Sequence, residues 1–213
     1  MSTTLRFTGR IAGWGTASGT RFVVGRWDAS PYGSFADVMV EHPDGERSLL
    51  APSEEIARLV ASTYRFDRVE VVPVVVIDAP PGGHRWRVSA GPLVAELTVG
   101  RRTTLGHLLR LVPRRVASSV AATRATDPVA RLLLRGVRTR GSAGSGRREY
   151  YGATDVHRLD DVRSTWEGED LGPVGAVDPP VRFGFGSTPA APSVTDVVTT
   201  IVLADGALGD VQG

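Results

Sequence analysis

Four side chains that can take up or release protons lie close together in one short segment of the chain. Glu149, Tyr151, Asp155 and His157 fall at alternate positions, with Ala153 between them. Because successive side chains of a β-strand point to opposite faces, an unbroken strand would place all four on one face. The pattern allows two alternatives, a row of acid–base groups for catalysis or the solvent-exposed face of an edge strand.

All of the positively charged side chains other than histidine are arginines, and they are unevenly distributed. The chain of 213 residues has 25 of them and contains no lysine. Residues 101–148 carry 12 arginines against one acid, whereas residues 149–213 carry 3 arginines against 11 acids. The absence of lysine excludes Schiff-base catalysis and the lysine-dependent phosphate loop.

The basic segment 101–148 has three interpretations. Its arginines form a rim that pairs with the carboxylate or phosphate of a ligand, or they pack against the acidic last third of the chain, or they bind an anionic lipid surface or a nucleic acid. Because the segment has no Phe, Trp or Tyr on which bases could stack, its composition argues against nucleic acid. For the first interpretation, the predicted ligand-binding residues are Arg110, Arg114, Arg115, Arg147 and Arg148.

Other familiar sites are missing from the sequence. There is no cysteine, and no two of the four histidines have the spacing of a helical metal site, so we expect neither a metal site nor a cofactor. The glycine-rich stretch 141–146 follows a helical pattern and precedes a strand, which is the reverse of the order in a dinucleotide site. No G-x-S-x-G nucleophile motif occurs.

The elements that would position these residues are mostly short strands bounded by turns. Before residue 100 the pattern predicts about seven strands and one short helix that follows its N-cap Ser53. The clearest local signal is the segment 42–45, His-Pro-Asp-Gly, which predicts a hairpin between strands at 35–41 and 46–50. Strands return at 147–159 and 194–203, whereas the paired acids Asp160 and Asp161 fall in loop-like sequence.

We therefore predict a mainly β fold of the β-rich α+β kind, an antiparallel barrel or strongly bent sheet with a few inserted helices. A single domain spans residues 1–205, with a helical insertion at about 103–138 and a flexible tail at 206–213. In broad architecture this resembles lipocalin-like and acetoacetate-decarboxylase-like barrels. The resemblance covers no motif, and the decarboxylase chemistry depends on a lysine that this chain lacks.

Our first hypothesis for the function is a small-molecule-binding protein. It would hold an apolar or amphipathic ligand, with or without an anionic group, in a barrel cavity with an arginine-rich rim. The alternatives are an enzyme that uses the row on 149–157, and peripheral binding to anionic lipid or to nucleic acid through the basic helices. The N-terminal residues lack the apolar core of a signal peptide, which favours a cytoplasmic location. The oligomeric state stays open.

Overall fold

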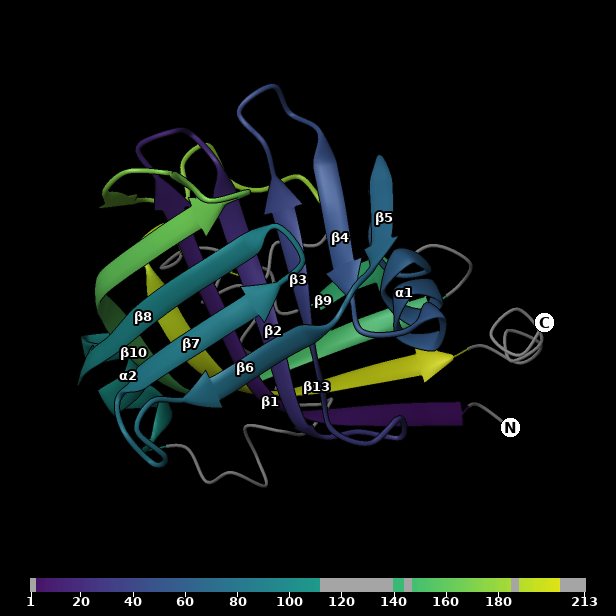
Figure 1. Cartoon of the computed structure of the whole chain (residues 1–213). Helices are drawn as coiled ribbons and strands as arrows, with labels where there is room; N and C mark the ends of the chain where they lie inside the picture. Colours follow the sequence, from purple (N-terminus) through teal and green to yellow (C-terminus); the bar gives the residue numbers. More distant parts are fainter. Residues whose placement is uncertain (1–2, 112–139, 144–146, 185–187, 204–213) are drawn as a thin grey trace.

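Strands dominate the computed structural model, which describes residues 3–111, 140–143, 147–184 and 188–203 (Figure 1). In chain order the strands are β1 (Thr3–Thr16), β2 (Arg21–Ala29), β3 (Phe35–Glu41), β4 (Arg47–Ala51), β5 (Arg68–Val71), β6 (Val74–Asp78), β7 (Arg85–Ala90), β8 (Leu93–Arg102), β9 (Arg140–Ala143), β10 (Arg147–Trp166), β11 (Glu169–Asp170), β12 (Val174–Gly175) and β13 (Ser193–Leu203). The described helices are α1 (Glu54–Ala61) and α2 (Thr104–Leu109). Neither of them has the length and apolar character needed to cross a bilayer.

The strands form one strongly curled open sheet, a half-barrel. Its order is β5-β4-β3-β2-β1-β13-β10-β8-β7-β6, and β9, β11 and β12 pair at its margins. Each ladder between the described strands is antiparallel except that between β4 and β5. In Figure 1 the strands β6, β7 and β8 cross in front of β1, β2 and β3. The prediction of a mainly β fold with a bent antiparallel sheet is confirmed.

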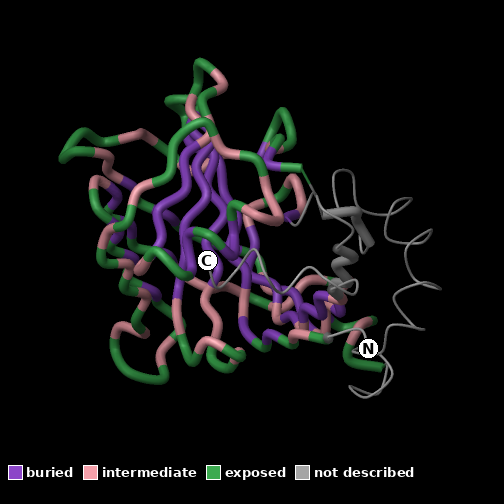
Figure 2. Tube along the Cα trace, turned by 90° about the vertical axis from the view of Figure 1, so that its right-hand side faces the viewer, coloured by how far each residue is buried: buried purple, intermediate pink, exposed green. Residues whose placement is uncertain are grey.

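Both faces are buried in the second half of β1, in the first half of β2 and in β3 and β4, and the buried parts of β2, β3 and β4 are rich in apolar residues. Val23 and Val24, which are neighbours in β2, belong to different core clusters, and so do Leu49 and Leu50 in β4. One cluster lies against α1 and is called the helix-side core; its main members are Phe7, Ile11, Val23, Met39, Leu49, Ile56, Leu59, Val60, Phe183, Val197 and Ile201. The buried stretches run through the middle of the strands (Figure 2).

The second cluster lies between β1–β4 on one side and β7, β8 and β10 on the other, and is called the strand-side core. Its members are Ala12, Trp14, Phe22, Val24, Val38, Val40, Leu50, Trp86, Val88, Ala90, Leu93, Ala95, Leu97, Leu159, Val162 and Val194. Trp14 stacks on Phe22 with ring centroids 5.1 Å apart, and Trp14 Nε1 donates to Ser164 Oγ at 3.0 Å. Large, fully buried rings thus fill the interior of the half-barrel in its described part.

The two local signals that the sequence carried most clearly are present. Gly45 has φ of +92°, and His42 N–H donates to the Glu46 carbonyl at 2.8 Å, which closes the predicted hairpin between β3 and β4. Ser53 caps α1, because its hydroxyl accepts a hydrogen bond from Ile56 N–H at 3.3 Å. Local sequence therefore determines the turn and the helix that flank β4.

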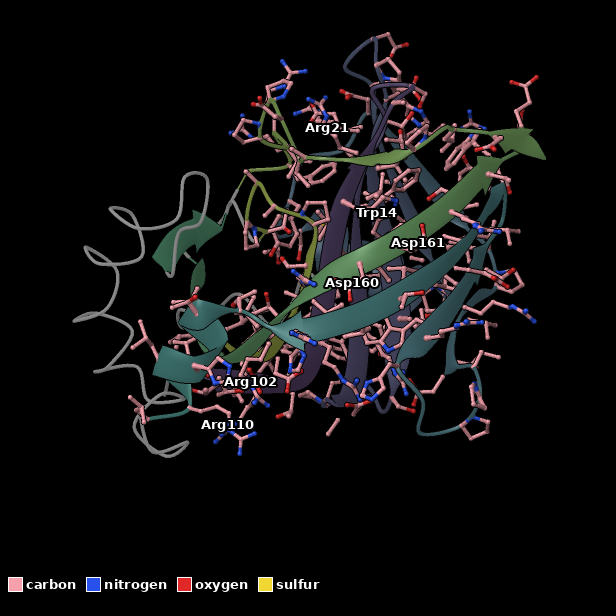
Figure 3. All side chains as sticks on the ribbon, turned by 90° about the vertical axis from the view of Figure 1, so that its left-hand side faces the viewer. Trp14, Arg21, Arg102, Arg110, Asp160 and Asp161 are labelled. Atoms are coloured by element: carbon pink, nitrogen blue, oxygen red, sulfur yellow. The ribbon has the colours of Figure 1, made fainter. Side chains whose placement is uncertain are left out.

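Two expectations about strand boundaries were wrong. The sequence pattern predicts one strand over 68–78, but the segment forms two, since Pro73 in the break has no N–H to donate to a ladder. The acids Asp160 and Asp161 lie within β10 and not in a loop (Figure 3). The strand continues there because Leu159 and Val162 are buried in the strand-side core. Most of the predicted helical insertion, residues 112–138, lies outside the described residues; α2 is its described part.

Candidate functional site

A pocket opens between the helix-side face of the sheet and α1. Residues of β1, β2, β3 and β13 line it, together with α1 and the turn that follows this helix. Its cavity volume is about 50 Å³, and the empty space including open solvent at its mouth is about 500 Å³. The lining is mainly aliphatic and aromatic, and its polar side chains are Asp37, Thr63, Tyr64 and Thr199. A few polar groups in an apolar concavity are typical of small-molecule sites.

Residues on one face of the neighbouring strands β2 and β3 form the floor of this pocket. Phe35, Asp37 and Met39 lie on one face of β3, and Gly25 and Trp27 lie on the same face of β2. Asp37 is directly opposite Gly25 in the ladder. A Cβ atom at Gly25 would stand 2.6 Å from Asp37 Oδ1 and 2.7 Å from Trp27 Nε1. Glycine at this position therefore leaves the room in which Trp27 reaches Asp37.

The Asp37 carboxyl is buried, with 4% of the residue exposed. Trp27 Nε1 donates to its Oδ1 at 2.9 Å, and no other donor within the described residues reaches the carboxyl. Burial away from water raises the pKa of Asp37 from 3.8 to about 7, and the hydrogen bond from Trp27 lowers it only in part. Near neutral pH the pocket floor thus carries a carboxyl that changes protonation readily, with Oδ2 open to a further partner.

Aromatic rings surround this carboxyl. Phe7 meets Trp27 edge to face with ring centroids 5.8 Å apart, and Phe35 lies 6.3 Å from Trp27 and 6.4 Å from Phe7. Tyr32 stacks on Phe7 at 6.4 Å. Packed rings of this kind hold one another in place. They give the pocket a wall with fixed shape beside Asp37.

The second polar group of interest is the Thr199 hydroxyl on β13. Thr199 lines the pocket, is 2% exposed, and its Oγ1 has no hydrogen-bond partner in the described structure. A buried hydroxyl without a partner costs free energy, about 1–3 kcal/mol. The cost is removed when a bound molecule supplies the missing hydrogen bond.

Sequence reasoning missed Asp37, Trp27 and Thr199. A signal for Asp37 was present, since an acid whose neighbours two residues away on the strand are Phe35 and Met39 must share their buried face. The burial of both faces of β3 concealed it, because the run reads as an ordinary apolar strand. No local signal marks Thr199, whose place in the pocket depends on pairing between the two ends of the chain.

The predicted acid–base row lies on β10, where a register shift interrupts the alternation of side chains. The ladder between β10 and β13 shifts register between Ala153 and Asp155, so the alternation that predicted a common face is interrupted there. In the ladder Tyr151 pairs with Thr199, and Asp155 pairs with Asp196. The side chains of Glu149 and Tyr151 lie outside the described part of the structure.

Asp155 and His157, the other two members of the row, belong to an ion-pair cluster beside α2. Arg102 Nε donates to both Asp155 carboxylate oxygens, at 2.8 and 2.9 Å, and Arg110 lies 3.9 Å from one of them. His157 Nε2 is 3.6 Å from Asp155, and its Nδ1 is 3.1 Å from the Gly100 carbonyl. Figure 3 shows Arg102 and Arg110 at the end of the sheet opposite Arg21.

The cluster holds Asp155 in its charged form. Burial, the largest single influence, raises the pKa of Asp155, but hydrogen bonds from Arg102 and the Val156 N–H and the nearby positive charges outweigh it, and the pKa is lowered overall. A carboxylate held in this way anchors α2 against β10. Gly106 allows the close approach, since a Cβ there would meet the Val156 carbonyl at 2.4 Å.

The predicted arginine rim is described only in part. Arg110 is exposed and points at Asp155, with 59% of its side chain accessible. Arg114 and Arg115 lie outside the described residues, as do the side chains of Arg147 and Arg148. Arg102 and Arg110 of the basic segment therefore contact the acidic last third of the chain, as the second interpretation of that segment expects. No arginine is among the described residues that line the pocket.

Within the described residues, no group of three or more His, Asp and Glu side chains is arranged to hold a metal ion.

Comparison with known proteins adds little. The sequence matches no family model and no curated protein. Among solved structures, a candidate AttH protein from Nitrosomonas europaea is similar over 93% of this chain and 50% of its own length, at 12% identity and a TM-score of 0.27. The chain thus spans about half the length of that protein. A likeness of this extent carries no inference about function.

Proposed function

We propose that the protein binds a small, largely apolar molecule in the pocket between the sheet and α1. One observation carries the proposal. Two buried polar groups, Asp37 and Thr199, line the same apolar pocket, and each has hydrogen-bonding capacity that is not used. A fold in which these groups served stability alone would pair them internally. A ligand that reaches them supplies the missing partners.

The size of the pocket limits the ligand. With a volume of about 50 Å³ it has room for a small group of atoms, and the remainder of the molecule must extend toward the solvent. Thr63 and Tyr64, just beyond α1, contribute to the lining. We therefore expect a small ligand of which one end is buried beside Asp37 and the other lies against aromatic and aliphatic side chains.

The test is a binding titration with a pocket-filling variant. The half-buried Thr63 lines the pocket, so Thr63→Trp places a large ring in it without disturbing the strands. We expect calorimetric titration with 2-phenylethanol to give saturable binding to the wild-type protein, and Thr63→Trp to weaken it at least about tenfold, which is about 1.4 kcal/mol. Native mass spectrometry of the protein as purified checks independently for a retained molecule.

The matched control is Thr165→Trp, the same substitution on β10 away from the pocket. It is expected to bind 2-phenylethanol like the wild type. The proposal is wrong if the wild-type protein neither binds apolar probes nor retains a small molecule, or if both tryptophan variants bind equally well.

A further inference from the structure

The electrostatic character of the pocket restricts the chemical class of its ligand, given that the pocket is the binding site proposed above. Among the described residues that line the pocket, Asp37 is the one acid, and no arginine or histidine accompanies it. A buried carboxylate without a cation in this lining creates a negative potential in the space above it. That potential attracts a cation and repels an anion.

The aromatic wall favours the same charge. The faces of Phe7, Trp27 and Phe35 carry the negative part of the ring quadrupole, and these three rings pack within 6.4 Å of one another beside Asp37. An ammonium group placed against such a face is attracted by the ring quadrupole. Trp27 also orients the carboxyl, since its Nε1–H occupies Oδ1 and leaves Oδ2 for the ligand.

The Thr199 hydroxyl supplies an independent observation. It is an acceptor that is 98% buried and unpartnered, and it lines the same pocket from β13. Thr199 lies on β13, three strands from Asp37 in the sheet, so the two groups meet different parts of a ligand. A primary ammonium has three N–H donors and no acceptor, which suits the Asp37 carboxylate. A ligand carboxylate, by contrast, would offer acceptors to Asp37, which is itself an acceptor once ionised.

We infer that the pocket binds a small apolar amine, whose ammonium group pairs with Asp37 and whose hydrocarbon part packs on Phe7, Trp27 and Phe35. Trp27 orients the carboxyl toward the ligand. The amine class replaces the anionic class that the arginine-rich segment suggested from sequence.

The experiment compares three probes of nearly equal shape, 2-phenylethylamine, 2-phenylethanol and phenylacetate, by calorimetric titration at about pH 8. We expect the amine to bind at least about tenfold more tightly than the alcohol, because a charge-assisted hydrogen bond is stronger than a neutral one. Phenylacetate is expected to bind most weakly. Asp37→Asn should reduce amine affinity about tenfold and leave alcohol affinity within about threefold.

The pH dependence of amine binding to the wild-type protein is a second readout that needs no variant. The described residues that line the pocket include no arginine, no histidine and no acid other than Asp37, so within this lining only Asp37 changes charge near neutral pH. With the pKa of Asp37 at about 7, the ionised fraction falls about tenfold between pH 8 and pH 6. Amine affinity should fall about tenfold with it, and Asp37→Asn should remove the dependence.

A matched control is Asp161→Asn, which removes an exposed carboxylate of β10 with 59% of its side chain accessible. It should bind all three probes like the wild type. The inference is overturned if the amine binds no better than the alcohol, if phenylacetate binds best, or if amine affinity is insensitive to Asp37→Asn and to pH. In those cases alcohol binding that Thr63→Trp weakens still supports the proposed function, whereas failure of every probe contradicts both.

Discussion

The buried carboxyl of Asp37 makes the stability of the protein depend on pH. Its pKa is about 7 in the folded state and 3.8 in the unfolded chain. Between these values the folded protein holds a proton at Asp37 that the unfolded chain has released, so the contribution of Asp37 to stability is greatest below about pH 4 and falls as the pH rises to 7. Ionisation of an unpaired buried carboxyl thus destabilises the apo protein at the pH where we expect it to bind a cation.

Asp37→Asn should remove this pH dependence. Relative to the variant, we expect the wild type to lose about 3 kcal/mol of unfolding free energy between pH 5 and pH 8, measured by urea denaturation. Because the change between the two pH values is compared, a pH-independent free-energy cost of burying the asparagine amide in the variant cancels. Asp161→Asn should follow the wild-type curve. Parallel stability curves for the wild type and Asp37→Asn would show that Asp37 titrates in the folded state as it does in the unfolded chain.

At the scale of elements, a buried ion pair fixes the segment 179–183 against the end of β3. Glu41 is fully buried, and its carboxylate receives hydrogen bonds at 2.7 Å from both the backbone N–H and the Nε of Arg182. Arg21, also buried, lies 3.2 Å from Glu41 and donates to the Pro179 carbonyl at 3.0 Å. The segment carries Phe183 into the helix-side core.

We predict that Glu41→Gln destabilises the protein by about 3–5 kcal/mol, because it leaves the buried Arg21 charge without its counter-ion. Arg21 Nε already has no hydrogen-bond partner, so no contact of that nitrogen replaces the lost ion pair. The control is Glu96→Gln, which breaks an exposed pair with Arg87 at 2.8 Å and should cost less than about 1 kcal/mol. Equal losses in urea denaturation would mean that Glu41 contributes no more than a surface pair.

Local elements could be predicted from sequence, and long-range ones could not. The hairpin at Asp44-Gly45 and the helix after Ser53 depend on a few adjacent residues, and both are present. The role of Glu41 depends on Arg182, 141 residues away, and nothing near Glu41 in the sequence indicates that partner. The parallel pairing of β5 with β4 joins residues on either side of α1, so adjacent residues do not indicate it either.

The same distinction explains why the candidate site was missed. Strand alternation identifies the face of β3 that holds Asp37, but the pocket exists because β13, from the end of the chain, pairs with β1 from its beginning. From the sequence alone, the acid–base row on β10 is the more evident candidate site, because its residues lie together in the chain. A register shift interrupts that row between Ala153 and Asp155, and no residue type in the segment predicts it.

For the molecule as a whole, the curled sheet produces two interiors of different character. The strand-side core, between β1–β4 and β7, β8 and β10, contains the fully buried rings of Trp14, Phe22 and Trp86. The helix-side core contains the pocket with Asp37 and Thr199. Dense packing in the first stabilises the fold, and the second provides the pocket beside α1.

The division between the two interiors allows a direct test of the central claim, that ligand binds on the helix side beside Asp37. The tryptophan side chains report on both interiors, since the Trp27 indole N–H donates to Asp37 at 2.9 Å whereas the Trp14 indole N–H donates to Ser164 at 3.0 Å. The measurement is the nitrogen-15 NMR spectrum of the indole groups during titration with 2-phenylethanol. We predict that the Trp27 signal shifts saturably while the Trp14 and Trp86 signals stay in place. A titration in which Trp27 is unchanged, or in which Trp14 and Trp86 move instead, would contradict the account.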